Sequence, residues 1–256
     1  MGLVTAMPSR SQLEASLRAT VHELGDRRAV PDRRWLSGLL GVSSDDLDRW
    51  LPEVASLAPL ARGLRRAHHE GGREFYAQFR APYELYVMTR ALRPDHVIET
   101  GVSSGVSSAH FLAALKRNHR GTLHSVDRPM VQSGPELQPS ESSVSVPPGR
   151  SSGWAIPASY RAGWDLRLGP SQEVLPPLVA GVPSVGIFLH DSQHTPTHLR
   201  FELETIRPKL LPGSIVMADN TTWTGEAFPR FARSLGAKVW RRGRSDLVGL
   251  RVTEPL

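Results

Sequence analysis

The sequence predicts an α/β protein with a doubly wound, mostly parallel sheet of seven strands and an antiparallel last strand. Short apolar runs alternate with helical patterns through most of the chain. One run, Val185–Leu189, has no polar alternation, which is typical of a parallel strand covered on both faces. Two late runs, at 238–240 and 247–252, follow each other without a helix and close the sheet as a β-β pair.

The other elements follow from spacing. A helix with Leu85, Met88 and Leu92 on its buried face precedes a strand that ends near residue 100. A helix with Phe111, Leu112 and Leu115 follows that strand. Further strands are expected at 121–127, 164–169 and 214–218, and further helices at 171–178, from residue 196 on, and at 227–235.

Two segments lie outside this alternation. Residues 1–70 are expected to form an N-terminal helical extension, a lid or dimerisation element, and residues 71–256 the main domain. Two stretches of the extension have apolar residues at helical spacing: Leu13, Leu17, Val21 and Leu24, then Leu47, Leu51, Val54 and Leu57. The segment 128–153 is rich in Ser, Pro and Gly and long for a loop, so it is expected to be either partly disordered or a functional lid.

Composition narrows the functional classes. The 256 residues include no cysteine, which excludes a disulfide framework and a cysteine zinc site. No apolar run is long enough to span a bilayer, and the N-terminus does not read as a signal peptide, so we expect a cytoplasmic protein with no membrane partner. The net charge is +6, but the basic residues are scattered, and we expect no nucleic-acid partner.

The stretch 97–108 is the first candidate site. It joins an apolar strand that carries Glu99 near its end to a turn with Gly101 and Gly105 and then to a helix. Such a turn lets the backbone approach a ligand closely, although many strand–turn–helix junctions carry glycines for geometry alone. Asp127 ends the next strand, where a carboxylate can accept hydrogen bonds from both ribose hydroxyls. Together they indicate an adenosine-type cofactor.

Acidic residues also end two later strands. Asp191 follows the strand 185–189, and Asp219 with Asn220 follows the strand 214–218. The carboxyl ends of parallel strands meet at one edge of the sheet, where ligands bind. Two carboxylates and an amide oxygen form the hard oxygen set that suits Mg²⁺ or a similar divalent cation.

Three histidines surround this second group. His194 lies three residues after Asp191 and is a candidate general base; the alternative is a surface loop histidine. His194 and His198 could share a zinc ion, but Pro196 interrupts a helix between them and the H-E-x-x-H pattern is missing. We interpret His190 as structural and His198 as a solvated helix residue.

These motifs resemble a known family. Glu99-Thr100-Gly101 with Gly105, followed by Asp127, is similar to the first motifs of class I S-adenosylmethionine (SAM)-dependent methyltransferases. The segments Gly169–Pro176, Phe188–Thr195 and Met217–Asn220 resemble the adenine-flanking and metal-ligand segments of the metal-dependent catechol-type and natural-product sugar O-methyltransferases. The resemblance covers about residues 75–256.

The resemblance implies a Rossmann-like methyltransferase fold, an enzyme that transfers a methyl group from SAM, and a small hydroxylated acceptor. It implies a divalent cation, Mg²⁺, on Asp191, Asp219 and Asn220, and His194 as the base, where the catechol enzymes carry a lysine. A homodimer or higher oligomer is expected. The residues implied for cofactor binding are Glu99, Gly101, Ser103, Gly105, Asp127, Gly169, Ser171, Gln172 and Asp191.

Two alternatives remain open. One is a nucleotide- or dinucleotide-binding oxidoreductase on the same sheet, which is disfavoured because the G-x-G-x-x-G spacing and a Tyr-x-x-x-Lys pair are missing. The other is a module that binds the cofactor without catalysis. A metal triad too dispersed to share an ion would favour it.

Overall fold

The structure is a computed structural model and describes residues 30–71, 79–129 and 146–255. These residues include a seven-stranded sheet with the spatial order β3-β2-β1-β4-β5-β7-β6. The strands are β1 (His96–Thr100), β2 (Thr122–Asp127), β3 (Trp164–Leu168), β4 (Val185–His190), β5 (Leu210–Ala218), β6 (Trp240–Arg241) and β7 (Val248–Arg251). The first five are parallel, and β7 pairs antiparallel with both β5 and β6. The predicted fold class is confirmed.

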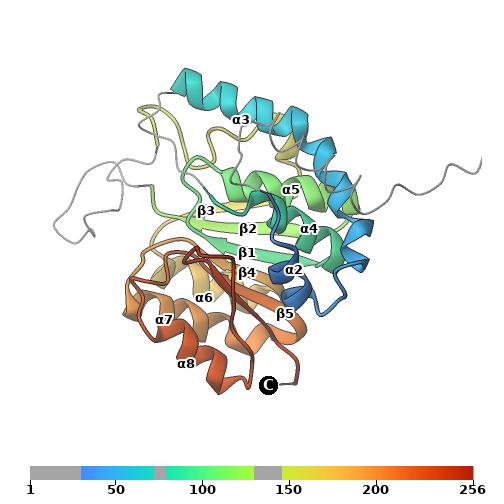
Figure 1. Ribbon diagram of the computed structural model, residues 1–256. Coiled ribbons are helices and arrows are strands. Elements are labelled where there is room, and N and C mark those ends of the chain that lie inside the picture. Colours follow the sequence, from blue (N-terminus) through green and yellow to red (C-terminus); the bar gives the residue numbers. More distant parts are fainter. Residues whose placement is uncertain (1–29, 72–78, 130–145, 256) are drawn as a thin grey trace, which may run out of the picture.

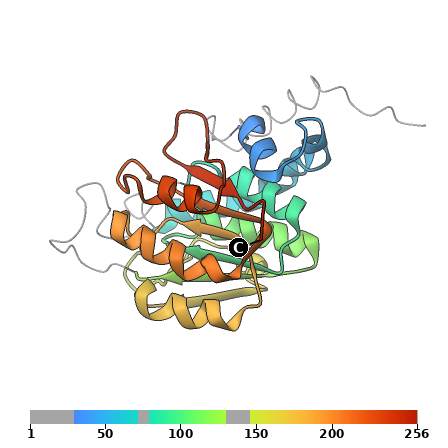
Figure 2. The ribbon, with the colours of Figure 1, turned by 90° about the horizontal axis from the view of Figure 1, so that it is seen from below.

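Helices cover both faces of this sheet (Figures 1 and 2). The upper face in Figure 1 carries α3 (Ala58–Gly71), α4 (Pro82–Leu92) and α5 (Val106–Asn118). The helix α2 (Arg33–Leu40) packs into the same core, against α4, β6 and β7. The lower face carries α6 (Ser171–Gly181), α7 (Pro196–Ile206) and α8 (Ala227–Ser234). Short 3-10 helices are η1 (Asp46–Arg49), η2 (Leu51–Leu57), η4 (Ala158–Tyr160) and η5 (Arg207–Lys209).

Each face has its own hydrophobic core. Adjacent residues of a strand point to opposite faces, so Val97 packs in the upper core and Ile98 in the lower. Phe111 of α5 lies in the upper core, and Phe188 and Leu199 lie in the lower. The central parallel strands β1 and β4 are therefore buried on both sides, as the unbroken apolar run of β4 predicts.

The described part of the N-terminal extension belongs to the upper core. Trp35 of α2 is 1% exposed, and its indole nitrogen donates to the carbonyl oxygen of Trp240, 3.0 Å away. Leu47 and Leu51 are buried as expected, but in 3-10 turns rather than in one helix. The helical pattern at Leu13–Leu24 lies outside the described residues.

The topology creates one switch point. The chain leaves β1 toward α5 on one face and leaves β4, its neighbour, toward α7 on the other. Loops after such a pair diverge and open a crevice beyond the carboxyl ends of the strands.

None of the helices in the described part of the chain has the length and apolar character needed to cross a membrane.

Candidate functional site

The glycines of the turn after β1, residues 101–105 (the cofactor turn), are required by close approach. Gly101 has φ +86°, and a Cβ there would lie 1.9 Å from the carbonyl oxygen of Asp191. Gly105 has φ +93°, and its Cβ would lie 2.6 Å from the side chain of Ile156. The turn therefore touches the loop after β4 on one side and a distant segment on the other.

Glu99 lies beneath this turn and is fully buried. Its carboxyl accepts hydrogen bonds from the hydroxyls of Ser107 (3.0 Å), Ser125 (2.6 Å) and Ser108. Burial raises the pKa of Glu99 to about 7, although the three hydroxyls oppose the shift. In this position Glu99 joins β1, β2 and the first turn of α5.

Asp127 ends β2 and faces the cofactor turn. Its carboxylate accepts from the backbone N–H of Val102 (3.2 Å) and from the hydroxyl of Ser152. Burial raises the pKa of Asp127 despite these hydrogen bonds. The sequence offered no signal for Ser152, because it belongs to the Ser-rich segment after β2 and is distinguished only by the fold.

Ser152 is the first residue of a strap, residues 152–156, that lies along the cofactor turn. The N–H of Gly153 donates to the carbonyl of Ser103 (2.8 Å), and the N–H of Ala155 donates to the carbonyl of Ser104 (3.1 Å). The end of the segment predicted as a loop is therefore an ordered cover of the turn. Residues 130–145 of that segment lie outside the described residues.

The segment after β3 reaches the same place. The N–H of Gly169 donates to the carbonyl of Asp127 over 2.9 Å. Ser171, 7% exposed, begins α6, and the amide nitrogen of Gln172 lies 3.1 Å from Nδ1 of His198. The residues predicted to bind the cofactor thus come together from the ends of β1, β2 and β3, with Asp191 beside Gly101.

Asp219 ends β5 on the other side of the crevice. It is 7% exposed, and among the described residues its Oδ1 has no hydrogen-bond partner. Burial and the nearby charge of Asp191 raise the pKa of Asp219 to about 7. Two adjacent carboxylates, one with an unsatisfied buried oxygen, form a site that gains free energy from a proton or a cation.

His194 bridges these groups. Its Nε2 lies 3.5 Å from Oδ1 of Asp191, and its Nδ1 lies 3.4 Å from the amide nitrogen of Asn220. Its ring is 7% exposed and meets the indole of Trp223 edge to face, with ring centroids 5.8 Å apart. His194 is therefore oriented by three side chains rather than being a free surface histidine.

The three residues predicted to bind a metal ion follow the neighbouring strands β4 and β5. Among residues 30–71, 79–129 and 146–255, no group of three or more His, Asp, Glu or Cys side chains could hold a metal ion. The predicted set has two carboxylates and relies on the amide of Asn220 as its third protein ligand.

The expectation of a solvated His198 is wrong. His198 is 7% exposed, and its Nε2 lies 2.9 Å from Oε1 of Glu202. Glu202 itself, fully buried on α7, was not recognised as a site residue from the sequence. Its signal was present: it is flanked by Leu199 and Leu203 on the inward face and lies four residues after His198.

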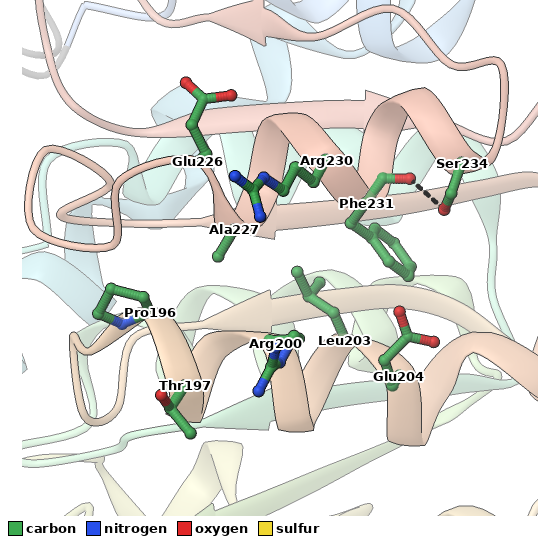
Figure 3. A pocket seen from close by; sticks show the side chains of 10 residues that line it. All are labelled: Pro196, Thr197, Arg200, Leu203, Glu204, Glu226, Ala227, Arg230, Phe231 and Ser234. Atoms are coloured by element: carbon green, nitrogen blue, oxygen red, sulfur yellow. Dashed lines mark hydrogen bonds between the residues drawn. The ribbon is translucent and has the colours of Figure 1, made fainter.

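A surface groove of about 330 Å³ between α7 and α8 lies apart from these residues (Figure 3). Leu203 and Phe231 line it together with the side chains of Arg200 and Arg230. It shares no residue with the predicted site. The groove is therefore separate from the polar residues at the strand ends.

The arrangement combines two half-sites in contact. The cofactor turn with Asp127 offers backbone N–H groups and a carboxylate to a nucleoside, and the loop 191–195 (the acceptor loop) with Asp219 offers carboxylates and an imidazole. Such a pair can hold a group donor beside an acceptor whose proton a histidine removes.

Comparisons with known proteins agree with this picture. The model of a family described as a methyltransferase domain matches residues 98–221. Among curated proteins, no sequence matches this chain significantly.

Solved structures extend the likeness to most of the chain. A methyltransferase from Podospora anserina with bound SAH (S-adenosylhomocysteine) aligns with 98% of this chain and 100% of its own, at 13% identity and a TM-score of 0.53. A putative O-methyltransferase from Klebsiella pneumoniae aligns with 82% of this chain and 100% of its own, at 14% identity and a TM-score of 0.53.

A third structure is the O-methyltransferase TomG from Streptomyces achromogenes, involved in tomaymycin synthesis and solved in complex with SAM. It aligns with 82% of this chain and 99% of its own, at 17% identity and a TM-score of 0.52. At these identities the structures establish the fold. The sheet of this chain, most of which lies within the matched residues 98–221, therefore has the Rossmann-like fold of these solved methyltransferases.

Proposed function

We propose that the protein transfers the methyl group of SAM to a hydroxyl of a small molecule, with the assistance of a divalent cation. The observation that carries the proposal is the contact of the two half-sites, where Gly101 of the cofactor turn meets the carbonyl of Asp191. Two ligands bound on either side of this contact would be adjacent.

The cofactor half is supported by Asp127 and the cofactor turn. A carboxylate at the end of β2 suits the ribose hydroxyls, and the glycines allow the backbone to approach the ligand. The hydroxyl of Ser152 donates to Asp127, as a ribose hydroxyl would. Bound SAM in TomG and bound SAH in the Podospora protein support the same cofactor here.

The cation half is supported by Asp219. Its buried Oδ1 lacks a partner, and the charge of Asp191 lies close enough to raise its pKa. A divalent cation held by Asp191, Asp219 and Asn220 would satisfy that oxygen and offset the repulsion between the two carboxylates. The donor set therefore fits an oxygen-liganded cation such as Mg²⁺.

When bound, SAM supplies an electrophilic methyl group and the cation acidifies the acceptor hydroxyl. The chain's own contribution is to orient and to move a proton. His194 would accept the proton of the acceptor hydroxyl on Nδ1 as the methyl group passes from the sulfonium to the acceptor oxygen. Asp191 faces Nε2 of the ring and orients it, and the acceptor hydroxyl would take the place of the Asn220 amide nitrogen at Nδ1. The strap covers the turn and limits the access of water.

Calorimetric titration of SAH, with Mg²⁺ and then with a chelator, tests the cofactor half. We expect binding by the wild-type protein. Replacing Asp127 by Asn removes a charged hydrogen-bond acceptor, which should weaken binding about 10- to 100-fold. Asp95→Asn is the matched control, since Asp95 is exposed and pairs with Arg120 outside the site.

Methyl transfer from labelled SAM to a panel of vicinal diols and catechols tests the reaction. If the chelator abolishes turnover, the complete proposal is supported. If turnover persists with the chelator, methyl transfer does not need the divalent cation. SAH binding without transfer to any acceptor favours a cofactor-binding module. A wild-type protein that binds no SAH contradicts the proposal.

The proposed role of residues 1–70 in dimerisation is tested by sedimentation equilibrium.

A further inference from the structure

Glu202 is a buried carboxylate of the lower face with four hydrogen-bond partners. Its Oε2 accepts from the hydroxyl of Thr100 and from Nδ1 of His190, both at 2.7 Å. Its Oε1 accepts from the hydroxyl of Ser192 and from Nε2 of His198, both at 2.9 Å. Glu202, Thr100 and His190 are each fully buried.

The hydrogen-bond donors around Glu202 determine the protonation state of this cluster. The amide nitrogen of Gln172 faces Nδ1 of His198, which leaves the proton of that ring on Nε2, toward Glu202. Burial alone would raise the pKa of Glu202, but His190 and His198 hold it well below its ordinary value. Glu202 is therefore an ionised carboxylate whose four acceptor directions are all used.

The four donors come from both half-sites. Thr100 ends β1 immediately before the cofactor turn, and Ser192 lies in the acceptor loop, between Asp191 and His194. Above Glu202 the two segments meet directly, because the N–H of Asp191 donates to the carbonyl of Thr100 over 2.8 Å. Glu202 thus bonds the residue before the turn and a residue of the loop, beside the point where the turn and the loop touch.

We propose that Glu202 is a positioning residue that clamps the acceptor loop to the cofactor turn and so sets the distance between the acceptor and the methyl donor. The inference rests on the proposed function for its consequence in turnover, and on the hydrogen bonds alone for the clamp. Glu202 touches neither ligand site. It acts through Thr100, His190 and Ser192.

Hydrogen exchange of the ligand-free protein tests the clamp without any acceptor. Glu202→Gln keeps the shape but turns two acceptor directions into donors that face other donors. We expect the amide hydrogens of residues 191–195 to exchange at least 10-fold faster, while β2 and α5 keep their rates. Thr100→Val is the second variant, because it removes one hydroxyl and leaves the carboxylate in place.

Thr205→Val is the matched control. Thr205 lies on the same helix, and its hydroxyl bonds the carbonyl of Phe201 instead of Glu202. Acceptor-loop exchange in folded Glu202→Gln that equals that of Thr205→Val overturns the inference. If Glu202→Gln does not fold, Thr100→Val decides on the same criterion.

Turnover separates positioning from general stability. Displacement of a reacting group by about 1 Å can cost on the order of 100-fold in rate. We expect Thr100→Val to lower kcat about 10-fold and to leave KM for SAM within twofold of the wild-type value. A variant with faster acceptor-loop exchange and wild-type kcat would overturn the positioning role. A wild-type protein that neither binds SAH nor transfers methyl groups contradicts the proposed function, and the exchange comparison then decides the clamp alone.

Discussion

Glu99 shows how a single buried residue ties pH to stability. Its pKa is raised to about 7 by burial, from an ordinary value of 4.5. The folded state therefore binds more protons than the unfolded state between these values. The stabilisation that Glu99 contributes to the free energy of unfolding is therefore fully present below about pH 4.5 and is lost as pH rises through about 7.

We predict that Glu99→Gln flattens this dependence. Urea unfolding at pH 5 and pH 8 measures the fall in the free energy of unfolding, which should be smaller in the variant by on the order of 3 kcal/mol. Gln keeps an oxygen that can accept from the serine hydroxyls. Equal falls in the wild type and the variant would contradict a raised pKa at this position.

His194 carries the prediction for the chemical step. Its ring contacts Asp191, Asn220 and Trp223. We expect His194→Ala to lower kcat by about 10²- to 10⁴-fold, the usual contribution of a general base, and to leave SAH affinity within twofold. His69→Ala, an exposed histidine on α3, serves as control. Unchanged turnover in His194→Ala would leave the ring with a packing role only.

The close contact between the cofactor turn after β1 and the acceptor loop after β4 depends on Gly101. Both Gly101 and Gly213 have positive φ, +86° and +96°, so an alanine at either position meets similar backbone strain of about 1–2 kcal/mol. Only Gly101 has a neighbour: a Cβ there would overlap the carbonyl of Asp191, whereas no atom lies within 4 Å at Gly213. The pair therefore separates strain from contact.

We predict that Gly213→Ala loses about 1–2 kcal/mol of stability and binds SAH normally. Gly101→Ala should lose more stability and bind SAH at least 10-fold more weakly, because the turn must move away from the acceptor loop. Thermal unfolding and calorimetry measure the two quantities. Similar SAH affinities in the two variants would show that the turn can move without cost to the cofactor site.

At the scale of the whole molecule, the sequence was most informative where one segment decides its own structure. The apolar run of β4 and the acids at the strand ends predicted the sheet and the edge at which Asp127, Asp191 and Asp219 gather. Contacts between distant segments were not predictable. The hydrogen bond from Ser152 to Asp127 and the four hydrogen bonds to Glu202 join segments that are distant in the sequence. Local periodicity cannot predict which distant segments come into contact.

The N-terminal extension illustrates the same limit, because its helical patterns did not say what they pack against. In the structure Trp35 is buried in the upper core and bonds the carbonyl of Trp240 near the other end of the chain. We predict that Trp35→Ala lowers the free energy of unfolding by about 3–5 kcal/mol, since it leaves a cavity in a shared core. Trp223→Ala is the matched control, because Trp223 is 38% exposed. Urea unfolding of both variants measures the difference; equal losses would contradict the burial of Trp35 in a core that the extension shares with the sheet.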